Sequence, residues 1–170
     1  MAHFPLTPSL SHRDLKPANI LLDKSFNPYV MDFGSVTRST IEINDSKEAR
    51  RWIDFAAINC TMTYRAPELF TISKGDIITE SSDVWSLGCI IYAMNWYESP
   101  FDCVYTRGDS VALAVASGLR NLPKNTNPFW SDKLSEIVMK AIHDTPSKRP
   151  TFPEIKRTIE SIDKVKNTVL

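Results

Sequence analysis

Glycine is scarce in this chain: five of its 170 residues are glycine, and none of them precedes Gly34. Lysine is likewise absent before Lys16. A loop that cradles phosphates through its backbone N–H groups needs several glycines and a nearby lysine. The sequence before Lys16 therefore contains no phosphate-binding loop of this kind.

Cysteine is also rare, and its three copies, Cys60, Cys89 and Cys103, lie far apart. Their number is odd and no two are spaced as CxxC, which argues against both a disulfide framework and a zinc site. Unpaired cysteines are typical of a reducing compartment.

Net charge and a long apolar segment are both missing. Twenty basic residues balance twenty acidic ones, so no charge field favours nucleic acid or an anionic membrane. The longest apolar run, residues 87–94, is far too short to span a bilayer. Residues 1–10 lack the basic start and apolar core of a signal peptide, and without glycine after Met1 the chain cannot be myristoylated there. We expect a soluble, cytoplasmic protein with no direct membrane insertion.

Apolar patterns predict two short strands and a mainly helical remainder, within one domain or one large lobe. Residues 19–23 and 28–32 are short apolar runs joined by KSFN, which favours a small hairpin. Residues 84–96 are apolar on nearly every side, as in a buried central helix, with Ser81 or Ser82 as its cap. Further helices are expected over residues 48–58 and 110–117 and after Ser131 and Thr151. Asp109 is the expected cap of the helix over residues 110–117, and Ser131 is the expected cap of the next. A Thr151–Glu154 capping box is expected at the start of the last helix.

The residues whose side chains could take part in a reaction lie in HRDLKPANILLD and in the MDFG that follows. The first segment holds a carboxylate (Asp14), an ammonium (Lys16) and an amide (Asn19), and the second holds another carboxylate (Asp32). Two acids, an amide and an ammonium around a phosphate and its magnesium ion would suit phosphoryl transfer.

These segments belong to an ordered set of motifs, HRDLKPAN, MDFG, YRAPE, DVWSLG and KRP. The set resembles the signature motifs of the eukaryotic protein kinases, and DLKPAN is similar to the serine/threonine type. The resemblance covers roughly residues 11–163. It implies an α+β, protein-kinase-like fold, of which this chain would be the C-terminal, mainly helical lobe with a small β-hairpin at the catalytic loop and no N-terminal lobe. Residues 1–10 would then be an irregular lead-in and residues 164–170 a tail.

The resemblance implies catalytic or cofactor-binding roles for five residues. Asp14 matches the aspartate that orients the substrate hydroxyl and accepts its proton. Lys16 matches the lysine that contacts ATP and neutralises the transferring phosphoryl group, and Thr61 matches the threonine that braces these two side chains. Asn19 and Asp32 match the two Mg²⁺ ligands, and oxygen ligands suit that ion. ATP and Mg²⁺ are thus the implied cofactors.

Other matched residues have structural or regulatory roles in the resemblance. His12 and Phe33 resemble packing residues of the family's internal spine, and Gly34 completes the MDFG motif. Arg13 matches an arginine that can pair with a phosphorylated residue. The hydroxyl-bearing candidates for that phosphorylation are Thr40, Ser46 and Thr61.

Three charged residues match buried structural groups of the family. Asp83 resembles the acid at the start of the central helix that holds the backbone of the catalytic loop. Glu68 and Arg149 match a buried ion pair that ties the activation segment to the last helices, and losing one partner of such a pair is costly. The tryptophans expected in the core are Trp85, Trp96 and Trp130.

A finer resemblance rests on RRWIDFAAINCTMTYRAPELF, DVWSLGCIIYAM, SPFD and GDSVALAVASG. These segments are similar to the Numb-associated kinase group, and within it to the branch called myristoylated and palmitoylated serine/threonine kinase. That group has an extra helix between DFG and APE, where residues 48–58 lie. Its members are implied to associate with Golgi or other secretory membranes through an acylated N-terminus, a signal that this sequence lacks.

The expected function is that of a serine/threonine protein kinase, with ATP and a protein hydroxyl as substrates and no nucleic-acid partner. Upstream of His12 there is no glycine-rich loop, no strand lysine and no glutamate to pair with it. The chain would therefore be a C-lobe fragment or a mis-started gene product, and a poor kinase alone. Two alternatives stay open: a kinase-derived module that docks other proteins through residues 60–70 and 98–120, and a pseudokinase scaffold. The intact Asp14, Asn19 and Asp32 argue against the scaffold.

Overall fold

The computed structural model describes residues 9–166, so most of the expected lead-in lies outside the described residues. The helices are α1 (Ser46–Asn59), α2 (Ser81–Trp96), α3 (Asp102–Thr106), α4 (Val111–Ala116), α5 (Asp132–Ala141) and α6 (Phe152–Lys166). The strands are β1 (Leu10–Ser11), β2 (Ile20–Leu22), β3 (Pro28–Val30), β4 (Thr37–Arg38), β5 (Ile41–Glu42) and β6 (Ile77–Ile78). The architecture is a helical body with small antiparallel ladders, as expected.

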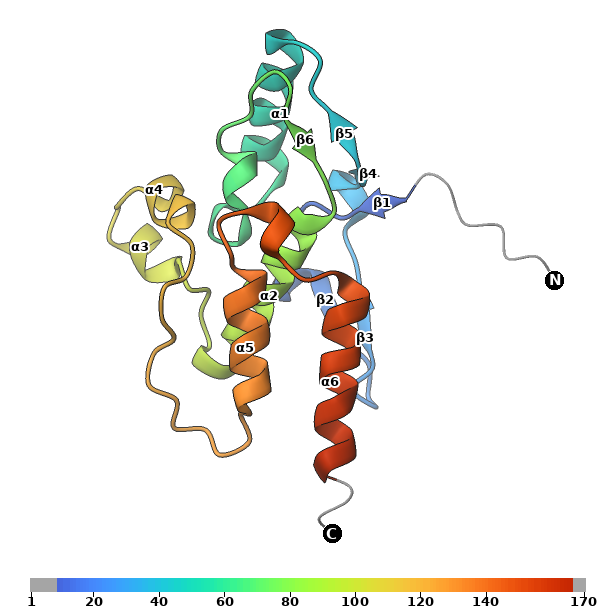
Figure 1. The fold of residues 1–170 in the computed structure, drawn as a ribbon, viewed down its shortest axis with the longest axis vertical. Coiled ribbons are helices and arrows are strands. Elements are labelled where there is room, and N and C mark those ends of the chain that lie inside the picture. The colour runs from blue at the N-terminus through green and yellow to red at the C-terminus, as the bar shows by residue number, and fades with distance from the viewer. Residues whose placement is uncertain (1–8, 167–170) are drawn as a thin grey trace, which may run out of the picture.

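Helix α2 is the centre of the fold, and the other helices are arranged around it (Figure 1). Most of its side chains are buried, among them Trp85, whose indole stacks on the ring of Phe101 with the centroids 5.7 Å apart. Helix α5 packs along α2, and α6 packs on α5. The prediction that the helix with apolar residues on nearly every side would be the buried central one is confirmed.

The hairpin predicted from the two apolar runs is present as β2 and β3, which pair antiparallel with Leu21 opposite Tyr29. Two further ladders, β1–β4 and β5–β6, join residues that are far apart in the sequence. Each of these strands has only two residues, too few for an alternating pattern to be recognised. Both ladders hold residues 37–42, at the start of the segment that follows MDFG, one against β1 and the other against β6 (Figure 1).

The helix starts agree with the sequence in two places and differ in two others. Ser131 caps α5, and Thr151 and Glu154 exchange the two hydrogen bonds of a capping box at α6. Neither Ser81 nor Ser82 caps α2, because the helix begins at Ser81 and its N-cap, Glu80, makes no side-chain cap hydrogen bond. The predicted cap Asp109 of α4 was wrong by one residue, since Ser110 accepts from the backbone N–H of Leu113. Helix α6 continues through Lys166, so the expected tail is helical at its start.

Gly88 lies where α2 crosses α5 most closely. A Cβ atom added there would come within 2.7 Å of the Ala141 Cβ and 2.9 Å of the Ile142 Cγ1. Both neighbours are fully buried, so neither can move aside.

Replacing Gly88 by valine is therefore expected to lower the free energy of unfolding by about 2–3 kcal/mol through overpacking. The measurement is urea unfolding followed by circular dichroism. The exposed Met94 on the same helix provides the control, because Met94→Val should change stability by about 0.5 kcal/mol or less. Equal losses for the two variants would show that the α2–α5 crossing tolerates a larger side chain.

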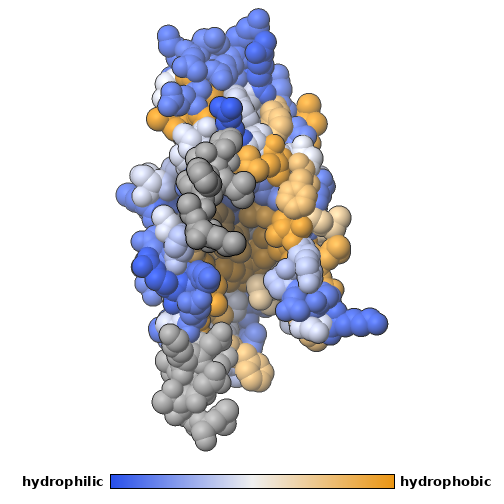
Figure 2. All heavy atoms as spheres, turned by 90° about the vertical axis from the view of Figure 1, so that its right-hand side faces the viewer, coloured by the Kyte–Doolittle hydropathy of each residue, from blue (hydrophilic) through white to orange (hydrophobic). Residues whose placement is uncertain are grey.

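One face of the molecule is apolar and open to solvent. Figure 2 shows apolar side chains gathered in a hollow on the side that carries β3, β4 and α6. A groove of about 640 Å³ beside α6 is lined mainly by apolar side chains, including Leu87, Ile155 and Ile159. The exposed apolar residues of the β2–β3 hairpin and of α2 include Leu21, Leu22, Val30 and Met94. Among the described residues nothing covers these exposed side chains.

Candidate active site

The catalytic loop is held by Asp83, near the start of α2. The Asp83 carboxylate is buried and accepts the backbone N–H groups of His12 at 2.7 Å and Arg13 at 2.8 Å. The backbone of Arg13 is left-handed, with φ of 68°, a conformation that a non-glycine residue keeps only when its surroundings enforce it. One carboxylate of the central helix thus fixes a strained turn just before Asp14.

The Arg13 guanidinium is buried and fully hydrogen-bonded, with 3% of the residue exposed. Each of its five N–H donors has an acceptor, and the acceptors are the Thr37 and Ser82 hydroxyls and the carbonyl oxygens of Arg38, Ser39 and Thr79. Burial lowers the pKa of Arg13, although the nearby Asp83 carboxylate opposes that shift. All five donors of Arg13 are therefore engaged in this structure, and its pairing with a phosphorylated residue stays a prediction.

Asp14 lies at the centre of a short polar cluster. Its Oδ1 accepts the Thr61 backbone N–H at 2.8 Å, and its Oδ2 pairs with the Lys16 Nζ at 2.8 Å. The same ammonium donates to the Thr61 Oγ1 at 2.8 Å. Burial alone would raise the pKa of Asp14, but the hydrogen bonds from Lys16 and Thr61 outweigh it and keep that pKa below the ordinary value. Asp14 is therefore ionised at neutral pH and able to accept a proton.

Asn19 and Asp32 come together at the end of the β2–β3 hairpin. Asn19 is buried, and its Nδ2 donates to the backbone oxygen of Asp14 at 2.9 Å and to the Asp14 Oδ2 at 3.2 Å. These bonds fix the amide nitrogen, so the amide oxygen is the atom left to act as a ligand. The backbone N–H of Met31 donates to the Asn19 carbonyl at 2.9 Å, which places Asp32 beside Asn19.

Asp32 is exposed and has a left-handed backbone, with its Oδ1 accepting the Gly34 N–H at 3.4 Å. Asn19 and Asp32 together offer two hard oxygen ligands. Mg²⁺ is commonly bound by one or two protein oxygens, with waters and phosphate oxygens as the other ligands, so this pair fits that ion. Within residues 9–166 no group of three or more His, Cys, Asp or Glu side chains is arranged to hold a metal ion by itself.

The two expected packing residues have different environments. His12 is buried, and its Nε2 lies 3.0 Å from the Met31 carbonyl oxygen. The Phe33 ring lies 5.7 Å from the His12 ring but is 67% exposed, because no other described side chain covers it. Phe33 is thus part of the open apolar face and not of the core.

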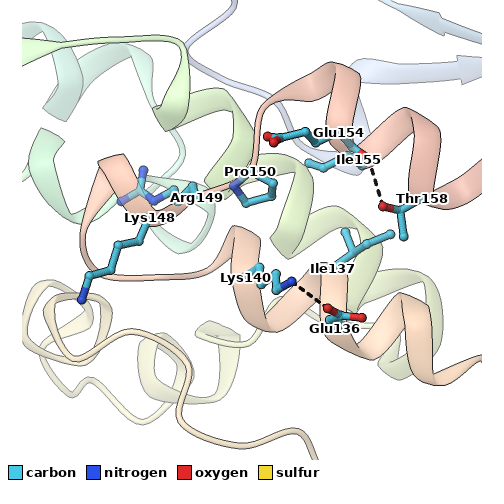
Figure 3. Close-up of a pocket in the computed structure, with 9 residues that line it drawn as sticks. All are labelled: Glu136, Ile137, Lys140, Lys148, Arg149, Pro150, Glu154, Ile155 and Thr158. Carbon is cyan, nitrogen blue, oxygen red and sulfur yellow. Dashed lines mark hydrogen bonds and ion pairs between the residues drawn. The ribbon is translucent and has the colours of Figure 1, made fainter.

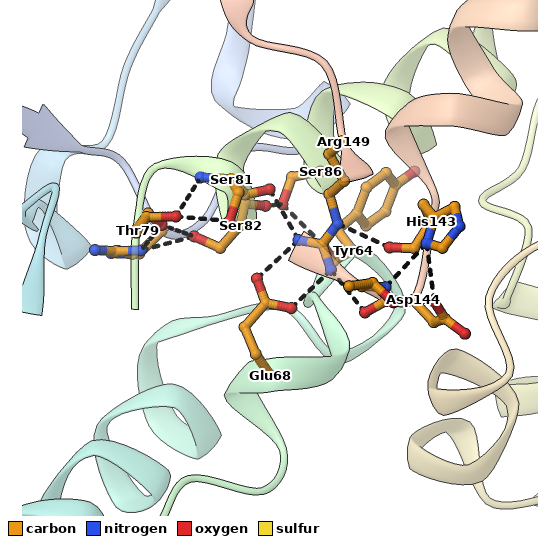
Figure 4. A network of polar contacts seen from close by, with 11 residues as sticks. Tyr64, Glu68, Thr79, Ser81, Ser82, Ser86, His143, Asp144 and Arg149 are labelled. Atoms are coloured by element: carbon orange, nitrogen blue, oxygen red, sulfur yellow. Dashed lines mark hydrogen bonds and ion pairs between the residues drawn. The ribbon is translucent and has the colours of Figure 1, made fainter. Parts of the chain in front are cut away.

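Arg149 and Glu68 form the ion pair that the sequence suggested, within a larger network (Figure 4). The Arg149 Nη1 lies 2.7 Å from the Glu68 Oε1, and the Nη2 donates to the Oε2 at 2.8 Å. Arg149 also donates to the carbonyl oxygens of Ser81 and His143. Sequence reasoning missed the buried serines that join other segments of the fold through backbone carbonyls. They include Ser86, which donates to the Tyr64 carbonyl, Ser35, which donates to the His12 carbonyl, and Ser99, which donates to the Thr63 carbonyl.

A separate pocket of about 360 Å³ lies between α5 and α6 (Figure 3). Lys140 at its edge pairs with Glu136 at 2.6 Å, and Thr158 donates to the Glu154 carbonyl. Asp14, Lys16 and Asp32 do not line it, and Arg149 at its wall is engaged by Glu68. It is not part of the candidate active site.

The structure thus brings Asp14, Lys16 and Asn19 together on a helical body, with Asp32 on the same hairpin, as the resemblance to protein kinases implies. The chain belongs to the protein kinase family, because residues 7–159 match the family described as protein kinase domain.

The chain is similar to curated serine/threonine kinases. It is 42% identical to serine/threonine-protein kinase 16 of Rattus norvegicus over 152 residues, which are 89% of this chain and 49% of that protein. The identity and coverage are the same for the Homo sapiens protein of that name. Serine/threonine-protein kinase ppk13 of Schizosaccharomyces pombe is 39% identical over 153 residues, 89% of this chain and 44% of that protein. The chain thus spans about half the length of the curated relatives it matches.

Proposed function

We propose that this chain carries the chemical centre of a serine/threonine protein kinase, which transfers the γ-phosphoryl group of ATP to a protein hydroxyl. The observation that supports this most is Asp14, held ionised by Lys16 and by the Thr61 backbone N–H. An ionised carboxylate in a fixed position can orient a serine or threonine hydroxyl and accept its proton. Lys16, bound to both Asp14 and Thr61, places a positive charge next to the transferring group.

The phosphate end of the nucleotide would be held through Mg²⁺ on Asn19 and Asp32. When bound, the ion neutralises charge on the phosphate oxygens. Asn19 contributes in a second way, because its Nδ2 ties the Asp14 side chain and backbone to the same hairpin. A shift in the metal ligands would therefore also displace the base.

We further infer that the described residues form only the C-terminal lobe and provide one wall of the nucleotide site. The exposed apolar side chains of Leu21, Val30 and Phe33 adjoin the polar cluster, and an apolar surface beside phosphate ligands suits a flat nucleotide base. With one wall, ATP would bind weakly and turnover by these residues alone would be slow. The match to about half of each relative supports this proposal.

The finer placement in the Numb-associated group, in the myristoylated and palmitoylated branch, is also a proposal. It is supported by α1, which lies between MDFG and YRAPE as the group's extra helix would. A cytoplasmic location, with or without contact to secretory membranes, is the matching proposal. No helix within residues 9–166 is long and apolar enough to cross a membrane.

The test of the phosphoryl-transfer proposal is Mg²⁺-dependent nucleotide binding combined with a turnover assay. A fluorescent ATP analogue titrated into the chain should bind weakly with Mg²⁺ and more weakly without it. Asp32→Ala should abolish the Mg²⁺ dependence, whereas Asp109→Ala, at an exposed acid paired with Arg107, should not. If the affinity for the ATP analogue depended neither on Mg²⁺ nor on Asp32, the proposed site would be contradicted.

In the same experiment, turnover of a serine peptide should be at least 10²–10³-fold below that of a typical kinase, because residues 9–166 hold few preorganised donors to the phosphates. Rapid turnover that Asp32→Ala abolishes would overturn the inference that these residues provide only one wall of the nucleotide site. It would still support the proposed phosphoryl transfer. A second candidate function, a docking module, is favoured by the open apolar face. It predicts protein binding that is indifferent to Mg²⁺ and ATP.

A further inference from the structure

A pocket of about 340 Å³ opens next to the candidate active site, between the end of α1, residues 60–65 and α3. Thr61 lines it, and the same residue donates its backbone N–H to Asp14 and accepts from Lys16. A peptide whose hydroxyl reaches Asp14 would therefore place a neighbouring side chain at this pocket. This inference rests on the proposed function for the position of the peptide.

Two charged side chains line the pocket, Asp102 and Arg65. Arg65 is buried, donates to the Cys60 carbonyl and lies over the Phe70 ring at 4.8 Å, so its guanidinium is held by these contacts. Asp102 is half-buried and forms no ion pair with any described residue. A side chain that enters from solvent meets the unpaired carboxylate.

Asp102 is positioned rigidly relative to Asp14. Its Oδ2 accepts the Ser99 backbone N–H at 2.7 Å, which leaves the Oδ1 without a hydrogen bond among the described residues. The Ser99 hydroxyl donates to the Thr63 carbonyl at 2.9 Å. The connection therefore runs from Asp102 through Ser99 and residues 61–63 to Asp14, and a ligand group at Asp102 lies at a fixed place relative to the catalytic carboxylate.

The wall of the pocket is apolar near its mouth. Met62 and Tyr105 line it, and Tyr105 is 62% exposed. Lysine and arginine side chains bury their methylene stems on apolar surface and leave the charged end for a polar partner. An exposed aromatic ring adds attraction for such a cation. The pocket thus offers contacts for both parts of a long basic side chain.

We propose that Asp102 is a specificity-determining residue that selects substrates with a lysine or arginine near the phosphorylated serine or threonine. Tyr105 and Met62 contact the stem of that side chain, and Asp102 pairs with its charged end. None of these three residues takes part in phosphoryl transfer.

Peptide binding to the full chain, measured by fluorescence anisotropy without ATP or Mg²⁺, tests this proposal. Labelled peptides with one serine carry lysine, norleucine or glutamate at each neighbouring position in turn. At one position lysine should bind about three- to fivefold more tightly than norleucine, the range for a partly exposed ion pair. Asp102→Asn should remove that advantage while keeping an oxygen acceptor for the Ser99 N–H. Asp109→Asn is the matched control and should keep the lysine preference.

A charge reversal sharpens the test. Asp102→Lys should shift the preference at the same position from lysine to glutamate, and circular dichroism verifies that each variant is folded. The proposal is overturned if no position prefers lysine, if Asp102→Asn keeps the preference, or if the unchanged protein prefers glutamate, which would point to Arg65. Because no nucleotide is used, failure of the phosphoryl-transfer proposal would appear in the ATP experiment and not in this one.

Discussion

Replacing Glu68 by alanine is expected to lower the free energy of unfolding by about 3–5 kcal/mol. The reason is the burial of its partner, since the side chain of Arg149 is 0% exposed and that of Glu68 is 18% exposed. Without Glu68 the guanidinium keeps its bonds to the Ser81 and His143 carbonyls but loses the neutralising charge. It cannot move to solvent, because it also lies over the Trp85 ring at 5.0 Å. Urea unfolding of the variant and the unchanged chain measures the loss.

The double variant Glu68→Leu with Arg149→Met separates the loss of a counter-ion from the loss of packing. Removing both charges leaves no unpaired ion, so the double variant should be clearly more stable than Glu68→Ala. Lys140→Ala is the control for a surface pair, because Lys140 and Glu136 are both well exposed, and it should cost about 0.5 kcal/mol or less. A loss of less than about 1 kcal/mol for Glu68→Ala would show that water or a neighbouring group replaces the carboxylate.

The residues of the candidate site could be selected from the sequence, because they belong to recognisable motifs and lie close together in the chain. Asp14, Lys16 and Asn19 lie within six residues, and one hairpin brings Asp32 to them. Five of the six described α-helices could be predicted for a similar reason, since their apolar spacing recurs within one segment, whereas the five-residue α3 is too short to show such spacing. Both the site motifs and the helices depend on residues that are close together in the sequence, so they can be recognised in it.

The features that sequence reasoning missed depend on backbone atoms brought from elsewhere. The five acceptors of Arg13 include carbonyl oxygens of Arg38, Ser39 and Thr79, and a carbonyl oxygen has no signature in a sequence. The misplaced cap at α2 has another origin, because the helix begins at Ser81 and both serines lie inside it. The exposure of Phe33 could not be predicted either, since it depends on which side chains lie next to the ring.

Replacing Asp83 by alanine is expected to lower the free energy of unfolding by at least about 3 kcal/mol and to loosen the catalytic loop. The backbone N–H groups of His12 and Arg13 would lose their acceptors, and each buried orphan donor costs about 1–3 kcal/mol. The buried Arg13 guanidinium would also lose a neighbouring negative charge. Urea unfolding measures the stability, and hydrogen exchange at residues 12–14 measures the local loosening.

Two further variants separate the loss of a hydrogen bond from the loss of charge at Asp83. Asp83→Asn keeps one oxygen acceptor and should fall between the unchanged chain and Asp83→Ala. Asp76 is an exposed acid that also accepts a backbone N–H, from Ser73, and its alanine variant should cost much less because water replaces the bond. If Asp83→Ala left hydrogen exchange at residues 12–14 unchanged, the left-handed turn at Arg13 would have to be held by the guanidinium contacts alone. The outcome therefore decides whether the Asp83 carboxylate or the contacts of the Arg13 guanidinium set the position of Asp14.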